Sequence, residues 1–354
     1  MLKYLLFCSF GLLFSQPLHR YGFENFADEH EFTQANWTGQ GFNVPWVNGF
    51  NNGRCHVDDA FSAEGTKSLR VRFDAGTFGP ANNGAQAPLM VNNYDELYAG
   101  YWVRFSNNFS WGTTNEGGKL PGLSGGNRCS GCQNCNGTNG FTARLMWRPN
   151  GRGVVYLYHM DKAGACGDNP QLRNPDNSNF HFQKGVWYHV AQRLKINTVG
   201  QYNGEVETFI NGQTASLITG LRFVTNADKV NSLYFSTFHG GADASWAPTV
   251  TCHIWFDDII ISTNKNDVLG TLSLQNEGQL NNNSTIKRFF FLENENLHID
   301  LPEINQITIY DQNGKVMLSS NKSVIKTGDL PMGVYILKVE TPEEILTRKL
   351  ILKN

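Results

Sequence analysis

After its first 15 residues, the sequence has no apolar run long enough to cross a membrane as a helix. The first segment, MLKYLLFCSFGLLFS, is itself too short to span a bilayer; it has one basic residue, an apolar run and a small residue before Gln16. This pattern predicts a secretory signal peptide over residues 1–15, cleaved after Ser15. Cys8 lies in the middle of the apolar run, which argues against a lipoprotein anchor. We therefore expect an exported protein without a membrane span.

Helical periodicity is also scarce. Short alternating runs recur instead, among them KSLRVRF, LYAGYWVRF, GVVYLYHM and HIWFDDIII, and turn signals separate them. The 36 glycines and the aromatic content of 12% suit a β protein with a surface for stacking. These features predict an all-β chain, with one jelly-roll or β-sandwich domain over residues 17–265.

The sequence has almost no net charge, −2, so the total says nothing about partners. The local balance is more informative, because between Arg104 and Lys195 there are 11 Lys and Arg against 4 acids. Such a zone suits an anionic polysaccharide, a polyuronate or a sulfated glycan, unless acids from elsewhere in the fold offset it. Nucleic acid is a weaker candidate, because an exported chain without a recognised binding module has little reason to meet it.

Cysteine is sparse, and an even number of cysteines follows the signal peptide. In an exported chain this predicts disulfide bonds, although the pairing cannot be deduced. Three of the cysteines are spaced C-x-x-C-x-x-C and could hold zinc, but a fourth ligand is not evident, so we expect disulfides that tether the 129–135 loop to distant strands, and no metal or cofactor. The loop with Asp168 and Asp176 is rich in oxygen atoms but lacks the regular spacing of a calcium site. The six cysteines are Cys55, Cys129, Cys132, Cys135, Cys166 and Cys252.

The stretch from GGKLPGLSGG to GVVYLYHMD contains the most informative pattern. It sets Lys119 in a glycine-rich segment, followed by FTARLMW, a PNG turn and a second strand. Alternation places Thr142, Arg144 and Met146 on one face of the first strand, and Tyr156 and Tyr158 on one face of the second.

The length of the turn decides whether these two faces coincide. A two-residue loop would pair Arg144 with Leu157 and turn the tyrosines away. A three-residue loop, with Gly151 in the left-handed conformation, pairs Arg144 with Tyr156 and brings Thr142 opposite Tyr158. We expect the second arrangement, which gathers the polar residues on one face.

This set of side chains suits proton abstraction from a hexuronate. The C5 proton becomes acidic only when the neighbouring carboxylate is neutralised or strongly hydrogen-bonded, and the planar fork of Arg144 can do this. A base must then remove the proton and an acid must protonate the departing C4 oxygen. Tyr156 and Tyr158 can fill either role, and we expect their pKa values to fall beside Lys119 and Arg144. The product is a C4–C5 unsaturated sugar, and no water is consumed.

The same motifs resemble the pattern of polysaccharide lyase family 14. They are GGKLPGLSGG, T-A-R and Y-L-Y, with FSTFHGG around His239 and FDDI in later strands, and the resemblance covers most of residues 20–265. It implies a jelly-roll fold with a cleft and lysis of alginate or glucuronan. The insert Cys129–Cys135 is more similar to fungal-type relatives, which leaves the substrate open. The resemblance implies as functional positions Lys119, Arg144, Tyr156 and Tyr158, with Thr142 where a small hydroxyl residue is usual.

Two histidines are further candidates for substrate contact. His239 precedes two glycines at a strand end and either lines the cleft or belongs to the core. His189 alternates with Trp187 and Arg193 along its strand.

Two other functions compete with a lyase. A glycoside hydrolase on a similar sandwich needs two placed carboxylates, but the E-x-D-x-E strand pattern is absent and Glu205-Val-Glu207 has no third acid after it. A lectin-like module that only binds carbohydrate would explain the fold and the basic zone. It gives no reason for one lysine, one arginine and two tyrosines in this arrangement.

The C-terminal part has a different character. Residues 284–354 form short alternating strands with a basic final strand, and they resemble the sorting domain of type IX secretion in Bacteroidetes. The alternative is a small carbohydrate-binding β-sandwich. Residues 266–283 are polar and rich in turns, so we expect a linker. The resemblance implies a protein that meets the secretion machinery and is released or held at the cell surface. We also expect a monomer.

Overall fold

The chain is described from a computed structural model. The structure describes residues 17–269, 290–293, 296–299, 301, 303–312, 314–342 and 345–352. The predicted signal peptide therefore lies outside the described residues, as does most of the predicted linker. The chain falls into two compact units that divide between residues 283 and 284.

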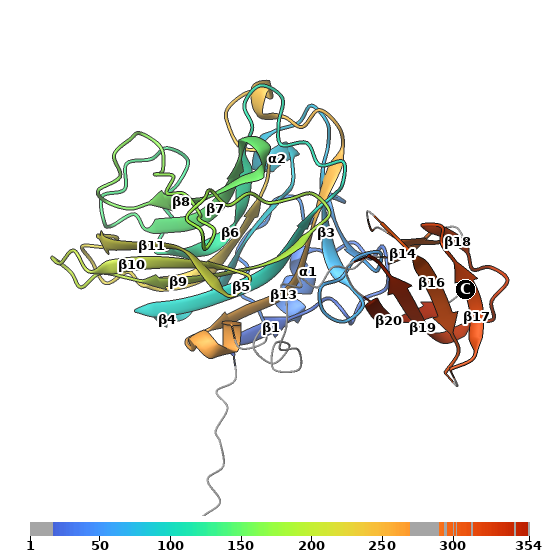
Figure 1. Cartoon of the computed structure of the whole chain (residues 1–354). Helices are drawn as coiled ribbons and strands as arrows, with labels where there is room; N and C mark the ends of the chain where they lie inside the picture. Colours follow the sequence, from blue (N-terminus) through green and yellow to red (C-terminus); the bar gives the residue numbers. More distant parts are fainter. Residues whose placement is uncertain are drawn as a thin grey trace, which may run out of the picture. The chain divides into compact units, whose positions relative to one another are not determined.

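The first unit contains two antiparallel sheets and, among its short helices, α1 (Gln34–Gly39) and α2 (Gly79–Asn82) (Figure 1). The eight-stranded sheet has the order β11-β10-β9-β5-β13-β3-β2, with β1 beside β13. Its strands are β1 (His19–Tyr21), β2 (Cys55–Asp58), β3 (Ser68–Phe73), β5 (Glu96–Phe105), β9 (Trp187–Lys195), β10 (Gly204–Ile210), β11 (Gln213–Leu221) and β13 (Cys252–Ser262). The five-stranded sheet has the order β4-β12-β6-β7-β8. Its strands are β4 (Ala85–Tyr94), β6 (Gly118–Gly125), β7 (Phe141–Arg148), β8 (Arg152–Tyr158) and β12 (Val230–Thr237).

Strand alternation decides which side chains enter the core between the sheets. In β7, Ala143 and Leu145 are fully buried in the main hydrophobic cluster, and so is Val155 of β8. Val103 and Val190 of the opposite sheet belong to the same cluster. Because alternate residues of a strand face opposite sides, the residues between them in β7 and β8 lie on the outer face of the five-stranded sheet. The predicted all-β sandwich is confirmed.

The β7–β8 turn has the predicted length of three residues. Pro149–Gly151 form a single 3-10 turn, and both Asn150 (φ 59°) and Gly151 (φ 74°) adopt the left-handed region. The strands then pair Arg144 with Tyr156, and Thr142 with Tyr158. On the other side of β7, Lys119 of β6 pairs with Met146. The turn and the pairing of β6 with β7 together bring the polar residues of three strands onto one face.

Four of the six cysteines form disulfides, Cys129–Cys135 and Cys132–Cys166. The predicted tether to distant strands is wrong in detail, because one disulfide closes within the 129–135 loop and the other joins that loop to the loop after β8. The prediction fails for Cys55 and Cys252, which are free and buried. These two lie on β2 and β13, which pair with opposite edges of β3. The strands that carry them are therefore about 10 Å apart, beyond the reach of a disulfide.

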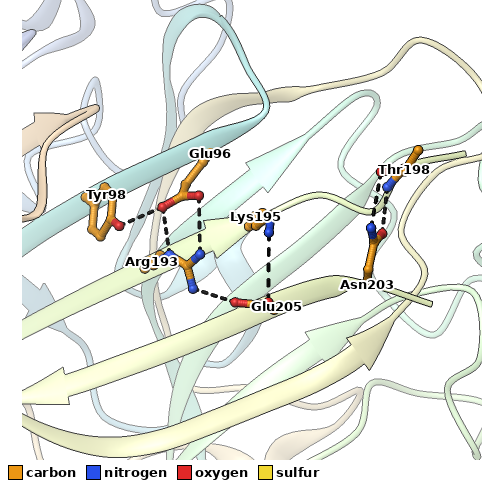
Figure 2. A network of polar contacts seen from close by, with 7 residues as sticks. All are labelled: Glu96, Tyr98, Arg193, Lys195, Thr198, Asn203 and Glu205. Carbon is orange, nitrogen blue, oxygen red and sulfur yellow. Dashed lines mark hydrogen bonds and ion pairs between the residues drawn. The ribbon is translucent and has the colours of Figure 1, made fainter. Parts of the chain in front are cut away.

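Acids from neighbouring strands offset part of the basic zone between Arg104 and Lys195. This is the alternative that the sequence left open for that zone. Arg193 of β9 donates to Glu96 of β5 at 2.8 Å and to Glu205 of β10 at 2.7 Å, and Lys195 lies 4.0 Å from Glu205 (Figure 2). The strand order brings these side chains together across three neighbouring strands of the eight-stranded sheet. These two basic residues are therefore neutralised within the fold and offer little to an anionic ligand.

The second unit is a small β-sandwich with its own core. A three-stranded sheet has the order β14-β15-β18 and a four-stranded sheet the order β17-β16-β19-β20. Leu297 of the first sheet shares one buried cluster with Ile307 and Leu337 of the second. The strands are β14 (Phe290–Glu293), β15 (Asn296–Ile299), β16 (Gln306–Tyr310), β17 (Val316–Ser320), β18 (Val324–Lys326), β19 (Gly333–Glu340) and β20 (Ile345–Leu352).

Among the described residues of both units, no helix is long and apolar enough to span a lipid bilayer.

Candidate active site

A cavity of about 690 Å³ lies on the outer face of the five-stranded sheet. Its floor is formed by side chains of β6, β7, β8 and β12, which alternate with the core residues of the same strands. Its walls come from the loops that contain Cys132, Cys166 and residues 241–246. Four predicted functional residues line it together, namely Lys119, Arg144, Tyr156 and Tyr158.

The two tyrosines form a hydrogen-bonded pair. Their hydroxyl oxygens are 3.0 Å apart, and the backbone N–H of Cys132 donates to the Tyr158 hydroxyl at 2.9 Å. Tyr156 is 7% exposed and Tyr158 is fully buried. The expected fall in the pKa of Tyr156 is wrong: burial raises it to about 12, and the hydrogen bond between Tyr156 and Tyr158 adds to this, while Arg144 only partly opposes the rise. Tyr156 therefore keeps its proton at neutral pH.

Arg144 is a buried guanidinium, and no acid among the described residues pairs with it. It is 3% exposed, and one terminal nitrogen donates to the Ser236 hydroxyl at 3.2 Å, while its Nε has no partner. The remaining contacts are with the faces of Tyr234 and Tyr156, 5.1 and 5.9 Å from the ring centroids. Burial lowers the pKa of Arg144, although guanidinium stays charged in proteins. An unpaired buried cation is costly, so this position favours an anionic ligand.

Lys119 is similarly placed. Its Nζ lies 4.2 Å from the centroid of the Tyr156 ring and 3.2 Å from the Met146 sulfur, and no ion pair involves it among the described residues. Burial, with the nearby charges of Arg144 and Arg148, holds the pKa of Lys119 well below its ordinary value. A bound carboxylate would reverse that effect and stabilise the ammonium form.

The cavity as a whole is positive. Lys119, Arg144 and Arg148 line it, and one acid, Asp243, belongs to the same lining. The carboxylate of Asp243 is already engaged, since it accepts from the backbone and the hydroxyl of Ser245. Three cationic side chains therefore face one carboxylate here, so this part of the basic zone keeps an excess of positive charge, unlike the arginine network in Figure 2.

Three predicted substrate contacts lie elsewhere. Thr142 is fully buried, and its hydroxyl donates to the carbonyl of Cys129 at 3.2 Å. His189 is fully buried on the eight-stranded sheet, with its ring 5.2 Å from that of Trp102. His239 is fully buried, and its ring stacks on that of Phe109. None of the three belongs to the lining of the cavity.

Several lining residues were not singled out from the sequence. Arg148 follows Arg144 and Met146 at two-residue intervals, so the alternation of β7 extended by one step would have found it. Tyr234 of β12 and the Cys132–Cys166 disulfide come from distant segments, and no local pattern indicates them. Within the part of the chain that the structure describes, no three His, Cys, Asp or Glu side chains group to hold a metal.

Comparison with protein families finds two matches in the chain. Residues 62–259 match the model described as Polysaccharide lyase 14, which is more than half of the 354 residues. Residues 293–353 match the model described as Secretion system C-terminal sorting domain. No curated protein sequence matches the chain.

Solved structures with a similar fold include several lyases. Alginate lyase Aly36B is 28% identical, with a TM-score of 0.59 over 70% of this chain and 97% of that one. Variants of Aly36B have been solved with alginate tetrasaccharide, after a lysine and a tyrosine were replaced by alanine, and with alginate trisaccharide, after a lysine and a methionine were replaced. The alginate lyase of Aplysia kurodai is 23% identical, with a TM-score of 0.56 over 70% of this chain and 99% of that one, and supports the fold alone.

Proposed function

Because the chain belongs to polysaccharide lyase family 14, we propose that it cleaves a polyuronate, alginate or glucuronan, by β-elimination in the cavity of the five-stranded sheet. One observation carries the proposal: a buried lysine and a buried arginine, neither paired with an acid in the part of the chain that the structure describes, lie beside a hydrogen-bonded pair of tyrosines. A polysaccharide lyase needs a site for the carboxylate and a group for proton transfer, and these residues supply both.

Arg144 and Lys119 are proposed to bind the carboxylate of the uronate that is cleaved. Two cations in a buried site stabilise the negative charge that moves onto the carboxylate when the C5 proton leaves. The guanidinium has an unused Nε and a planar arrangement of donors that matches a carboxylate. Lys119 lies on β6, which is the neighbour of β7 in the sheet, and its side chain lines the same cavity as that of Arg144.

Tyr158 is proposed to carry the proton transfer, with Tyr156 as its partner. Loss of the C5 proton and of the C4–O bond leaves a C4–C5 double bond, and the departing oxygen takes a proton. A phenolate formed at Tyr158 would keep two donors, the Cys132 N–H and the Tyr156 hydroxyl. Tyr156 holds its proton because burial raises its pKa to about 12, so it suits the role of donor.

The solved complexes of Aly36B support this choice of residue types. Alginate oligosaccharides were captured in variants that lack a lysine and a tyrosine, or a lysine and a methionine. In the present chain Lys119, Met146 and Tyr158 line one cavity. We propose that Thr142 acts indirectly through the Cys129 carbonyl, and we assign no substrate contact to His189 or His239, because neither side chain reaches the cavity lining.

The rest of the chain is proposed to serve export. The C-terminal sorting domain directs the protein through the type IX machinery to the cell surface or the extracellular space. We propose a signal peptide at residues 1–15, a lyase domain at 17–265, a linker at 266–283 and a sorting domain at 284–354. We also propose that the protein is a monomer.

The test is a panel of polyuronates incubated with the purified protein. A lyase produces the ultraviolet absorbance of a C4–C5 unsaturated uronate on at least one polymer of the panel. A lectin-like module would bind the polymer without any new absorbance, and a hydrolase would release reducing ends without it. Either outcome would overturn the proposed function.

A further inference from the structure

A second hollow, of about 360 Å³, adjoins the cavity. Arg148, Asn169 and Trp246 line both, so the two form one continuous surface. Arg152 lines the second hollow and does not line the first. The additional space lies beside the β7–β8 turn, next to the site proposed for the cleaved sugar.

Two arginines lie directly opposite each other at this place. Arg148 and Arg152 are the last paired residues before the β7–β8 turn. Like charges in directly opposed strand positions destabilise a sheet, and burial, with a smaller effect of Arg152, lowers the pKa of Arg148. Neither arginine forms an ion pair within the described residues. Glu116 also lines the second hollow, and its carboxylate accepts from the Asn150 backbone N–H at 2.7 Å. The two arginines therefore leave this hollow with a net positive charge.

We propose that Arg148 and Arg152 bind the carboxylate of a neighbouring uronate in the polymer, one sugar removed from the bond that is cleaved. The inference rests on the proposed function and adds to it a second carboxylate subsite. A uronate polymer carries one carboxylate per sugar, so a row of cationic positions matches its repeating charge. The half-buried Trp246 between the two hollows offers a ring against which a sugar can pack.

The variant Arg152→Gln tests the subsite. We expect KM for long polymers to rise about tenfold, the scale of one lost charge-assisted hydrogen bond, with kcat at saturation and KM for the shortest cleaved oligomer unchanged. Arg173→Gln is the matched control, because it removes one exposed arginine outside both hollows. A KM for long polymers equal to that of the control would overturn the subsite. A wild-type protein inactive on every polyuronate would instead overturn the proposed function, and the subsite with it.

A different observation concerns the loop that holds Tyr158. Cys132, whose N–H donates to the Tyr158 hydroxyl, adopts φ 63°, a left-handed conformation that non-glycine residues rarely take. Such a conformation persists where the surroundings over-determine it. Here the Cys132–Cys166 disulfide ties the loop to the segment after β8, and the Cys129–Cys135 disulfide closes the loop around it.

We infer that the Cys132–Cys166 disulfide positions the amide that holds the Tyr158 hydroxyl. The step rests on the role proposed for Tyr158, and Cys132 acts through that tyrosine. Gly167, next to Cys166, packs so closely on Tyr158 that an added Cβ would lie 2.6 Å from the tyrosine ring. The disulfide therefore holds the Cys132 amide and the Gly167 backbone against Tyr158. Disulfides of this kind form in an oxidising compartment.

The double variant Cys132→Ala/Cys166→Ala tests this. We expect kcat to fall at least about tenfold, with KM for the polymer unchanged, and we expect no further loss of kcat when Tyr158→Phe is also present. The control Cys129→Ala/Cys135→Ala removes the other disulfide and should lower kcat less. An unchanged kcat, or losses that add in the Tyr158→Phe background, would overturn the inference.

Titration of the wild-type protein with reductant gives the same comparison without a substitution. The loss of kcat should follow the appearance of the Cys132 thiol, measured by alkylation and mass spectrometry. Full activity with that thiol fully labelled would overturn the inference, even if the double variant does not fold.

Discussion

Replacement of Tyr158 by phenylalanine removes one oxygen atom from the centre of the proposed site. The ring stays, so packing against Tyr156 is kept, but the only group at this position that can exchange a proton is lost. We expect kcat to fall about 10²–10⁴-fold, the usual scale of acid–base catalysis, while KM changes little.

The structure also indicates what the substitution costs in stability. The Cys132 N–H loses its acceptor and the Tyr156 hydroxyl loses a partner. Each buried group left without a partner costs about 1–3 kcal/mol, so the two losses together cost about 2–6 kcal/mol. This is below most of the ~5–15 kcal/mol range by which a typical domain is stable, so the variant should remain folded.

Tyr101→Phe provides the matched control. Tyr101 is a buried tyrosine of the core whose hydroxyl donates to the Pro121 carbonyl at 2.9 Å, outside the cavity lining. Its variant should lose a similar amount of stability and keep its kcat. The assay is the initial rate of unsaturated product, with thermal unfolding measured in parallel. Equal rates for Tyr158→Phe and the wild type would refute the proton-transfer role, and equal losses in both variants would show that stability alone is responsible.

Three further predictions concern other parts of the chain. Arg144→Lys should lower kcat strongly, because a point charge cannot replace the planar fork of donors. The control Arg193→Lys, outside the cavity, should leave kcat unchanged. Near-normal rates in Arg144→Lys would contradict the proposed binding of the carboxylate by Arg144. A chain of residues 17–269 should keep full activity per molecule. It extends past residue 265 to include Val268, which is buried against Ile260 of the first unit. A folded but inactive product would show that the C-terminal domain takes part in the chemistry. Stability should decrease as the pH falls from about 6.5 towards 3, because burial lowers the pKa of His239 to about 3 and the unfolded chain binds the proton more readily. Denaturant unfolding of His239→Phe should show a weaker dependence over that range, and an unchanged dependence would contradict this account.

The local part of the site could be read from the sequence because it depends on strand alternation and one turn. The three-residue turn fixed which residues of β7 and β8 share a face, and the pairing of Arg144 with Tyr156 followed. The histidines could not be placed this way, since alternation says which residues share a face but not which sheet or which face borders the cavity. His189 lies on the other sheet, and His239 turns into the core.

The remaining differences between the predictions and the structure arise from burial, from strand order and from a backbone group. The pKa of Tyr156 was expected to fall because the sequence shows nearby positive charges, but the extent of desolvation becomes visible only in the folded structure. The disulfide pairing depends on which strands are neighbours, and β3 separates Cys55 from Cys252. The Cys132 amide has no sequence signal, because every residue except proline has one.

The most direct test of elimination is the fate of water in the products. The purified protein is incubated with a polyuronate oligomer in water labelled with heavy oxygen, and the products are weighed by mass spectrometry. We expect the masses of the two products, corrected for the exchange of the reducing-end oxygen that an uncleaved oligomer also shows, to sum to that of the substrate, with no further label in either. Products that together gain one water and carry the heavy oxygen would show hydrolysis and contradict the account.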